Sequence, residues 1–329
     1  MLNRRHIRVK VMQSIYATSQ SNGDDLIKEE KFLKFSISKI YDLYVLMLSL
    51  LVEVRNLAEE YQEIAKKKHL ATSEEINPSR KFIDNQFLCE LNKNISLQTY
   101  LQDQKKLKRN TSSITYMHGQ KLRNWKEDDE YVRVIWDAIE GSEVYKAYIN
   151  SDSDHSYKKD LKFIREVYQT VIAPNEKLFD YFESENLSWV DDIPFVNTWF
   201  LKNIKKINAD TIFNKNKIYN DKDDEDFAID LFRKVASHHT EFKDDIDKKT
   251  PNWDTDRIAE IDFILMKMAL TEFVYFPSIP TRVTINEYIE IAKDYSTAKS
   301  GYFINGVLDK LLKDYMASDR IQKIGRGLL

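Results

Sequence analysis

Residues 253–312 read WDTDRIAEIDFILMKMALTEFVYFPSIPTRVTINEYIEIAKDYSTAKSGYFINGVLDKLL. Apolar residues recur at helical spacing in three blocks, which are separated by Pro277 and Pro280 and then by a polar turn before Ser300. Proline cannot continue a helix, and serine is favoured just before a helix begins. Gly306, inside the third block, predicts a close helix crossing. The segment therefore predicts three helices, at about 256–276, at 283–295 and from 300 onward.

The composition of the whole chain agrees with a helical fold. Its 329 residues are 42% apolar and 31% charged, with only 7 glycines and 6 prolines. β-Sandwiches and nucleotide-binding α/β folds use many glycines in turns and phosphate loops, so both are disfavoured. A single cysteine, Cys89, excludes an internal disulfide framework and a cysteine-based zinc site. We expect an all-α protein with no metal and no cofactor.

The N-terminus is the basic end of the chain. Residues 4–20 are expected to form a helix, because apolar residues repeat every four positions at Ile7, Val11 and Ile15. The net charge of −3 disfavours a globally basic nucleic-acid binder, so contact with RNA or DNA should be local. The N-terminus lacks the long apolar run of a secretory signal, and we expect a cytoplasmic protein. The first ten residues hold four cations and no acid: Arg4, Arg5, Arg8 and Lys10.

The middle of the chain has two different compositions. Residues 26–68 have a long helical pattern, whose apolar centre at 43–54 is interrupted by Ser49 and Glu53 and is too short to cross a bilayer. Residues 69–125 are rich in Asn, Gln, Ser and Lys and are the best candidate for an insertion. Within them we expect short helices at about 82–91 and 95–107.

The segment 160–205 is similar to the segment that starts at 224, at a constant offset of 64 residues and without a gap. Two interpretations remain open: two ordinary helical hairpins of similar periodicity, or a degenerate internal duplication. The identical pairs are Asp160/Asp224, Phe163/Phe227, Val171/Val235, Asp180/Asp244, Trp189/Trp253, Asp192/Asp256 and Leu201/Leu265.

Four motifs of the chain are ALTEF (269–273), IPTRVTINEYIEIAKDY (279–295), SGYFINGVLDKL (300–311) and the N-terminal RRHIRVKVMQSIYA (4–17). Together they resemble the NusB family of transcription antitermination factors. Members of ordinary length are less than half as long as this chain. The resemblance therefore implies an arginine-rich first helix at 1–20, a mainly helical insertion at 21–223 with the possible repeat at 160–205, a NusB-like core at 224–315 and a flexible tail at 316–329.

The resemblance implies a NusB-like bundle of two packed helical subbundles that binds RNA and catalyses no reaction. Its expected partners are boxA-type single-stranded leader RNA of ribosomal transcripts, the ribosomal protein NusE and the RNA polymerase elongation complex. Neither a membrane nor a small-molecule substrate is implied.

The same resemblance indicates candidate site residues. Contact with RNA is expected from Arg4, Arg5, Arg8, Tyr16, Lys299, Ser300 and Phe303, and contact with the protein partner from Glu272. Arginines would bind phosphates and the aromatic rings would stack on bases. Other roles stay open for each of them: a solvated basic terminus for the arginines, core packing for Tyr16 and Phe303, and simple solvation for Glu272.

Two further functions remain open. The chain could be a helical protein–protein adaptor without RNA binding, or a detached relative of the NusB-like domain fused to some ribosomal RNA methyltransferases. The absence of a glycine-rich cofactor half disfavours the second. His238 and His239 are adjacent and face different sides of a helix, so they cannot chelate a metal together. The acidic run 221–226 lacks the pattern of a calcium loop and is expected to be a charged linker before a helix.

Overall fold

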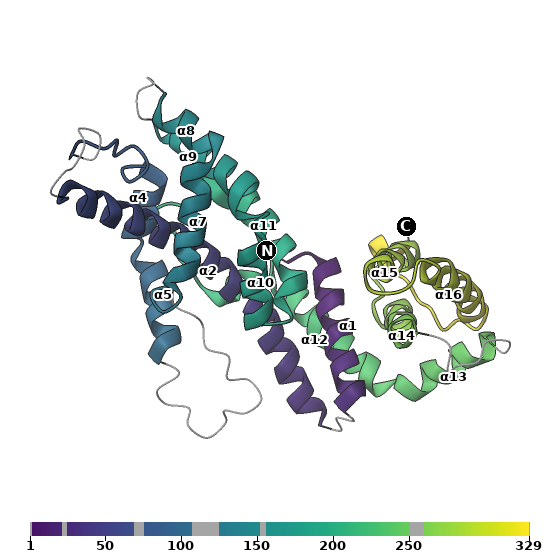
Figure 1. The fold of residues 1–329 in the computed structure, drawn as a ribbon. Helices are drawn as coiled ribbons and strands as arrows, with labels where there is room; N and C mark the ends of the chain where they lie inside the picture. Colours follow the sequence, from purple (N-terminus) through teal and green to yellow (C-terminus); the bar gives the residue numbers. More distant parts are fainter. Residues whose placement is uncertain are drawn as a thin grey trace. The chain divides into compact units, whose positions relative to one another are not determined.

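The structure is a computed structural model that describes residues 2–21, 25–68, 76–106, 125–151, 156–250 and 259–328. In these residues every regular element is helical, mostly α-helix with short 3₁₀ and π-helical turns. The all-α prediction is confirmed for the described part of the chain (Figure 1).

The chain divides into two compact units. Unit 1 comprises residues 1–37 and 218–329, and unit 2 comprises residues 38–217. The sequence instead predicted a middle segment at 21–223. The start of the second helix belongs to unit 1, because Glu30 on that helix accepts a hydrogen bond from Arg233 at 2.6 Å.

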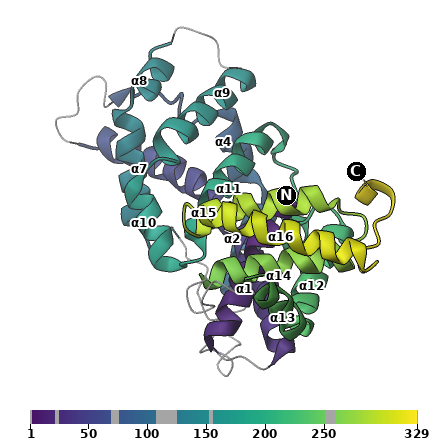
Figure 2. The ribbon, with the colours of Figure 1, turned by 90° about the vertical axis from the view of Figure 1, so that its right-hand side faces the viewer.

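Unit 1 is built around one buried helix, α14. Eleven of the sixteen residues of α14 are buried, because apolar side chains occupy its whole circumference. Helices α1, α12, α15 and α16 pack around it (Figure 2). The helices of unit 1 are α1 (Arg4–Ser21), the first turns of α2 (Leu26–Lys66), α12 (Lys222–Ser237), α13 (His239–Lys249), α14 (Glu260–Tyr275), α15 (Thr281–Tyr295), α16 (Ser300–Ala317) and the 3₁₀ turn η5 (Gly325–Leu328).

The three helices predicted from residues 253–312 are confirmed as α14, α15 and α16, although residues 251–258 lie outside the described residues. α15 begins at Thr281, directly after Pro280. The prediction for Gly306 was wrong. A Cβ placed there would have no neighbouring atom within 4 Å, so this glycine faces open space and marks no helix crossing.

The segment after α16, which the sequence predicted to be a flexible tail, packs against unit 1. The Lys323 amine donates hydrogen bonds to the carbonyl oxygens of Glu272 and Phe276, at 3.0 and 2.9 Å. The backbone N–H of Ile324 donates to the carbonyl of Pro277 at 3.1 Å. The carbonyls of Glu272 and Phe276 also accept backbone hydrogen bonds, from Phe276 and Ile279. The segment therefore adds hydrogen bonds at and after the end of α14.

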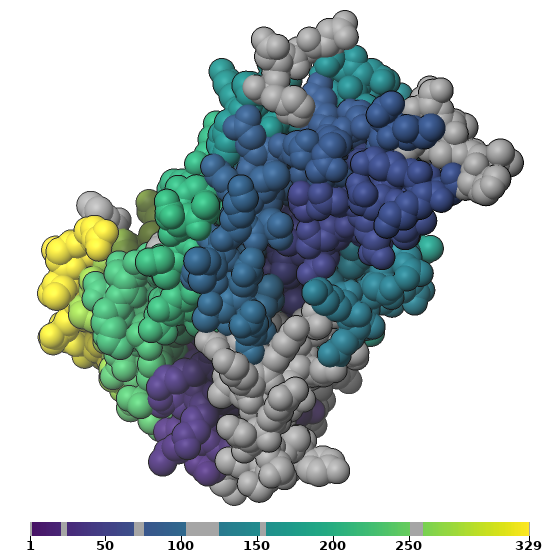
Figure 3. Space-filling view, turned by 90° about the vertical axis from the view of Figure 1, so that its left-hand side faces the viewer, coloured from purple at the N-terminus to yellow at the C-terminus, as the bar shows by residue number. Residues whose placement is uncertain are grey.

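Unit 2 has a core formed by the second part of α2, where residues 40–48 are all buried. Figure 3 shows α4 and α5 in blue beside the later, dark blue part of α2. The further elements of unit 2 are α4 (Gln86–Lys93), α5 (Ile95–Lys106), α7 (Asp129–Gly141), α8 (Glu143–Ile149), α9 (Tyr157–Val167), η1 (Tyr168–Ile172), α10 (Glu176–Glu185), α11 (Trp189–Asn203), η2 (Ile204–Lys206) and η3 (Lys215–Ile218), which ends on the first residue of the returning unit 1.

α2 is more apolar than the interruptions at Ser49 and Glu53 indicated. It has 41 residues and is the one described helix that is long and apolar enough to cross a membrane. However, 83% of its most apolar window is buried inside the protein. This burial is the behaviour of a core helix.

The two similar segments adopt similar structures. α9 and η1 together span 157–172, and α12 spans 222–237, which is the same length at an offset of 65 residues. The second helices, α10 and α13, also correspond. Asp160 and Asp224 are both buried, as are Phe163 and Phe227. Both interpretations, two ordinary helical hairpins and a degenerate duplication, are compatible with this agreement. Trp253 and Asp256 of the proposed pairs lie outside the described residues.

Candidate nucleic-acid interface

The basic helix α1 is positioned by its apolar stripe. Ile7, Val11 and Ile15 are buried, and α1 packs against α12, α14 and α15. At its start the Asn3 side chain accepts a hydrogen bond from the His6 backbone N–H at 2.9 Å. This N-cap bond satisfies one of the amide groups that a helix leaves free in its first turn.

Arg8 does not lie on the surface, contrary to its assignment as an RNA contact. The residue is only 2% exposed. Its guanidinium donates two hydrogen bonds to the Glu272 carboxylate, at 2.6 and 2.8 Å. Burial would lower the pKa of Arg8, but the charge of Glu272 and its hydrogen bonds outweigh burial and raise that pKa above its ordinary value. Arg8 therefore stays charged and fixes α1 to α14.

Glu272 cannot contact a protein partner in this structure, because the residue is completely buried. Besides Arg8, its carboxylate accepts hydrogen bonds from the Tyr288 hydroxyl at 2.6 Å and the Thr284 hydroxyl at 3.1 Å. A buried carboxylate is costly unless it is paired and hydrogen-bonded, and this one has both kinds of partner. Its role is to join α1, α14 and α15. The apolar neighbours of Glu272 in the ALTEF motif were the sequence signal for this burial.

Arg4 and Arg5 are the arginines of α1 that reach solvent, with side chains 40% and 45% exposed. Arg4 donates from Nε to Asp224 at 3.0 Å. Arg5 donates two hydrogen bonds to Glu287, at 2.8 and 2.9 Å. A guanidinium has five N–H donors, so each arginine keeps donors for a further acceptor.

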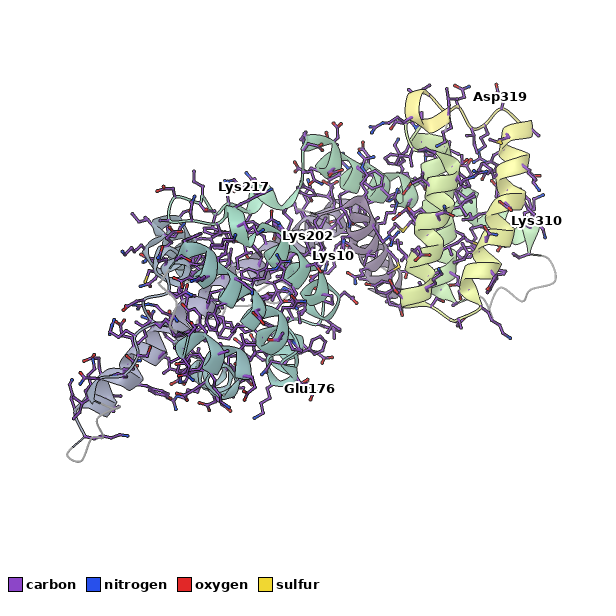
Figure 4. The ribbon with its side chains drawn as sticks, turned by 90° about the horizontal axis from the view of Figure 1, so that it is seen from above. Lys10, Glu176, Lys202, Lys217, Lys310 and Asp319 are labelled. Carbon is purple, nitrogen blue, oxygen red and sulfur yellow. The ribbon has the colours of Figure 1, made fainter. Side chains whose placement is uncertain are left out.

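Two other basic residues of α1, Lys10 and His6, add less exposed positive charge than the sequence suggested. Lys10, which is labelled in Figure 4, is only 2% exposed. Burial, and then the positive charges of Lys10 and Arg5, lower the pKa of His6 to about 4. His6 is therefore neutral near pH 7, and the exposed positive charge of α1 comes from Arg4 and Arg5.

The candidate residues outside the arginines divide between surface and core. Tyr16 is 39% exposed and Lys299 is exposed, whereas Phe303 is half-buried. Ser300 is buried, and its hydroxyl accepts a hydrogen bond from the Thr297 backbone N–H at 3.2 Å. Ser300 therefore shapes the turn before α16 and is not available as a surface contact.

Sequence reasoning missed Tyr302, which is 86% exposed in the first turn of α16. Aromatic side chains on a surface provide faces on which bases stack. The signal was its position, because Tyr302 lies outside the buried stripe formed by Ile304, Val307 and Leu311.

A groove of about 880 Å³ borders the start of α1. Its cations are Arg4, Arg5, Arg8 and Arg326, and its carboxylates are Asp221, Asp223 and Glu287. Ile279, Pro280 and Val283 form an apolar part of its wall.

The acidic run 221–226 is not a simple linker, because the Asp221 side chain caps α12. It accepts a hydrogen bond from the Asp224 backbone N–H at 3.0 Å.

A second cavity in unit 1, of about 710 Å³, is lined by α1, the first turns of α2, α12, α13 and α14. It contains the buried Lys267, whose amine lies 3.0 Å from Nδ1 of His239. His238 instead contacts Glu241 and Tyr275. Among the described residues, no group of three or more His, Cys, Asp or Glu side chains could hold a metal ion.

Comparison with known proteins places one part of the chain beside a known family. Residues 197–313 match the model of the NusB family. This part of the chain is therefore similar to the NusB family, within a chain that is longer than the relatives below.

Three relatives are each called transcription antitermination protein NusB. The protein of Salinibacter ruber is 46% identical over 104 residues, which are 32% of this chain and 65% of the relative. The protein of Chloroherpeton thalassium is 39% identical over 104 residues, 32% of this chain and 49% of the relative. The protein of Methylacidiphilum infernorum is 38% identical over 94 residues, 29% of this chain and 66% of the relative. The chain thus spans between half and two thirds of these relatives. No solved structure matched.

Proposed function

We propose that this protein binds RNA and acts in transcription antitermination. The observation that carries the proposal is the match of residues 197–313 to the NusB family. These residues include α14, which holds the exposed arginines of α1 in place through the pair Arg8–Glu272. In finer detail, we propose that it acts in the cytoplasm on boxA-type leader RNA, with NusE and the RNA polymerase elongation complex. Its role is binding and not catalysis.

The exposed residues that support RNA binding are Arg4, Arg5, Tyr16, Lys299 and Tyr302. The cations would bind phosphates, which position the RNA, and the tyrosines would stack on bases. Arg8, Ser300 and Glu272 act from inside the bundle by fixing α1 and the start of α16.

The test is binding of a fluorescent boxA-type RNA to the full chain between 50 and 200 mM salt, with and without NusE. The variant R4A/R5A removes the two exposed arginines of α1. We expect its affinity to fall about tenfold, and the slope of log affinity against log salt to shrink by about 1.4, at about 0.7 per lost phosphate contact.

A matched control is R80A/R133A in unit 2, where two exposed arginines are likewise paired with carboxylates. This control should bind RNA as the unchanged protein does. Equal losses in both variants would show nonspecific electrostatics, and no loss in R4A/R5A would contradict the site.

The second candidate function is a protein–protein adaptor without RNA binding. It is favoured by the ion pairs that already engage Arg4 and Arg5, and by the burial of Arg8 and Lys10. Capture of NusE by the full chain, with no RNA binding at 50 mM salt, would support this function. The methyltransferase-related alternative predicts binding of S-adenosylmethionine, which calorimetry on the same protein tests directly.

A further inference from the structure

The segment that follows α16 lies beyond the residues 197–313 that match the NusB family, and it is fixed in place along its length. Arg320 donates to Asp245 at 2.8 Å and also pairs with Glu241. Lys323 donates to two carbonyls at the end of α14, and Ile324 to the carbonyl of Pro277. The segment is therefore a packed part of unit 1.

Its last turn fits closely around a glycine. A Cβ on Gly327 would lie 1.9 Å from the carbonyl oxygen of Pro277, a distance that no side chain can have. Gly327 is buried, and its backbone N–H donates to the carbonyl of Ile324 at 2.8 Å. Only glycine allows this approach of the two backbones. The close approach holds the turn η5 against the residues that join α14 to α15.

The packing of η5 around Gly327 sets the position of Arg326. It lies in η5, is exposed, and lines the 880 Å³ groove together with Arg4 and Arg5. Arg4 and Arg5 each donate to a carboxylate, whereas Arg326 has no ion-pair partner among the described residues. Among the exposed arginines of the groove, Arg326 is therefore the one whose N–H donors can all bind an acceptor from a ligand.

The other side chains of the groove define what it can accept. Ile279, Pro280 and Val283 offer an apolar wall, and Val283 is 45% exposed. Asp221 is engaged as the cap of α12, and Glu287 is engaged by Arg5. Asp223 is exposed and repels a second negative charge on its side of the groove. The groove therefore suits a ligand with one anionic group and one flat apolar face, and its volume lies within the range of small-ligand sites.

We propose that this groove is a nucleotide subsite of the RNA-binding surface, in which Arg326 binds a phosphate of single-stranded RNA and the wall at Pro280 and Val283 contacts its base. The proposal rests on the RNA-binding function proposed above. It adds to that function a segment outside the family-matched residues.

The first test compares R326A with K310A in the full chain. Lys310 is an exposed cation on α16, on the side of the bundle away from α1 (Figure 4). With fluorescent boxA-type RNA, we expect R326A to weaken binding about fivefold at 50 mM salt and to reduce the salt slope by about 0.7, the value for one phosphate contact. K310A should change neither quantity. Equal affinities of R326A and the unchanged protein would overturn the proposal.

The second test moves Arg326 without removing its charge. G327V introduces the clash with Pro277, so the turn η5 must leave its place. We expect a loss of RNA affinity similar to that of R326A, with the far-UV circular dichroism unchanged. G306A is the matched control, because a Cβ at Gly306 meets no atom within 4 Å.

The experiments distinguish failure of the proposed RNA-binding function from failure of the subsite at Arg326. If the unchanged protein binds no RNA, the proposed function and the subsite both fail. If it binds RNA and R4A/R5A weakens binding while R326A does not, the proposed function stands and only the subsite fails.

Discussion

Among the residues that the structure describes, each unit contains one carboxylate residue with no exposed surface, Glu272 in unit 1 and Asp42 in unit 2, and the two are held differently. In unit 1, Glu272 accepts hydrogen bonds from Arg8 and from the Tyr288 hydroxyl at 2.6 Å. In unit 2, Asp42 pairs with Lys39 and Lys215, both at 2.9 Å, and accepts from the Tyr100 hydroxyl, also at 2.6 Å. The chemistry is nearly the same, a carboxylate with a tyrosine and cationic partners.

The difference lies in access to water. The Arg8 side chain is 3% exposed and binds Glu272 through two parallel N–H groups, so this cluster is closed. The Lys215 side chain is 31% exposed, so the Asp42 cluster has one partner that reaches solvent. Removing either partner of a closed pair lowers the free energy of unfolding strongly, because the remaining charge stays buried without its partner. A cluster with two lysines tolerates the loss of the outer one.

The largest expected effect comes from R8A, which leaves Glu272 charged and buried without its cation. We expect a loss of about 3–5 kcal/mol in the free energy of unfolding, measured by urea denaturation followed by circular dichroism. R5A, which removes an exposed arginine from the same helix, should cost less than about 1 kcal/mol. The double variant R8M/E272M should recover most of the loss of R8A. A small effect of R8A would contradict the closed cluster.

D42A tests the cluster of unit 2 and should cost about 2–3 kcal/mol, because Lys39 and the Tyr100 hydroxyl lose their shared acceptor. Tryptophan fluorescence is the suitable measurement, since four of the five tryptophans lie in unit 2. D129A removes an exposed carboxylate of the same unit and serves as control. A cost equal to that of R8A would remove the proposed difference between the clusters.

The buried lysines add a contrast that pH can measure. Lys39 has a carboxylate partner, whereas the amine of Lys267 lies beside neutral His239. Burial lowers the pKa of Lys267 from 10.5 to about 8; Glu260 raises it and Lys243 lowers it by smaller amounts. Between these pH values the unfolded chain binds more protons, so the free energy of unfolding should rise with pH.

Between pH 8 and pH 10, we expect the free energy of unfolding to rise by about 2 kcal/mol more in the unchanged protein than in K267M. Burial also lowers the pKa of Lys323 to about 8, so a smaller rise should persist in K267M. Denaturant unfolding at several pH values gives both curves. Parallel curves would show that Lys267 is charged in the folded protein.

K215A should have the smallest effect, below about 1 kcal/mol, because its partly exposed charge is screened and Lys39 remains beside Asp42. K39A is the matched comparison and should cost more, since Lys39 is buried. The same urea titration with tryptophan fluorescence compares them. If K215A were the more harmful of the two, the outer lysine would be the main partner of Asp42.

Local signals in the sequence predicted the helices well and the roles of charged residues poorly. α14, α15 and α16 follow from apolar periodicity and two prolines, which act over a few residues. The burial of Arg8 depends on a partner 264 residues away, and charged residues are expected on the surface.

The same limit explains the other features that were missed. The Asp42 cluster is assembled from positions 39, 42, 100 and 215, none of which forms a pattern in the sequence. The position of Arg326 depends on the fit of Gly327 against Pro277, and this fit is a property of tertiary packing. Periodicity identifies the buried face of a helix but not its distant partners.

The separation between Arg8 and Glu272 also sets the order of events during synthesis. A ribosome that adds roughly 5–20 residues per second makes Glu272 roughly 13–50 s after Arg8. For most of this time the apolar stripe of α1 lacks both α12 and α14, and residues 38–217 are complete before either of these helices is made. The nascent chain therefore finishes its middle unit first, and the helix that emerges first is among the last to be packed.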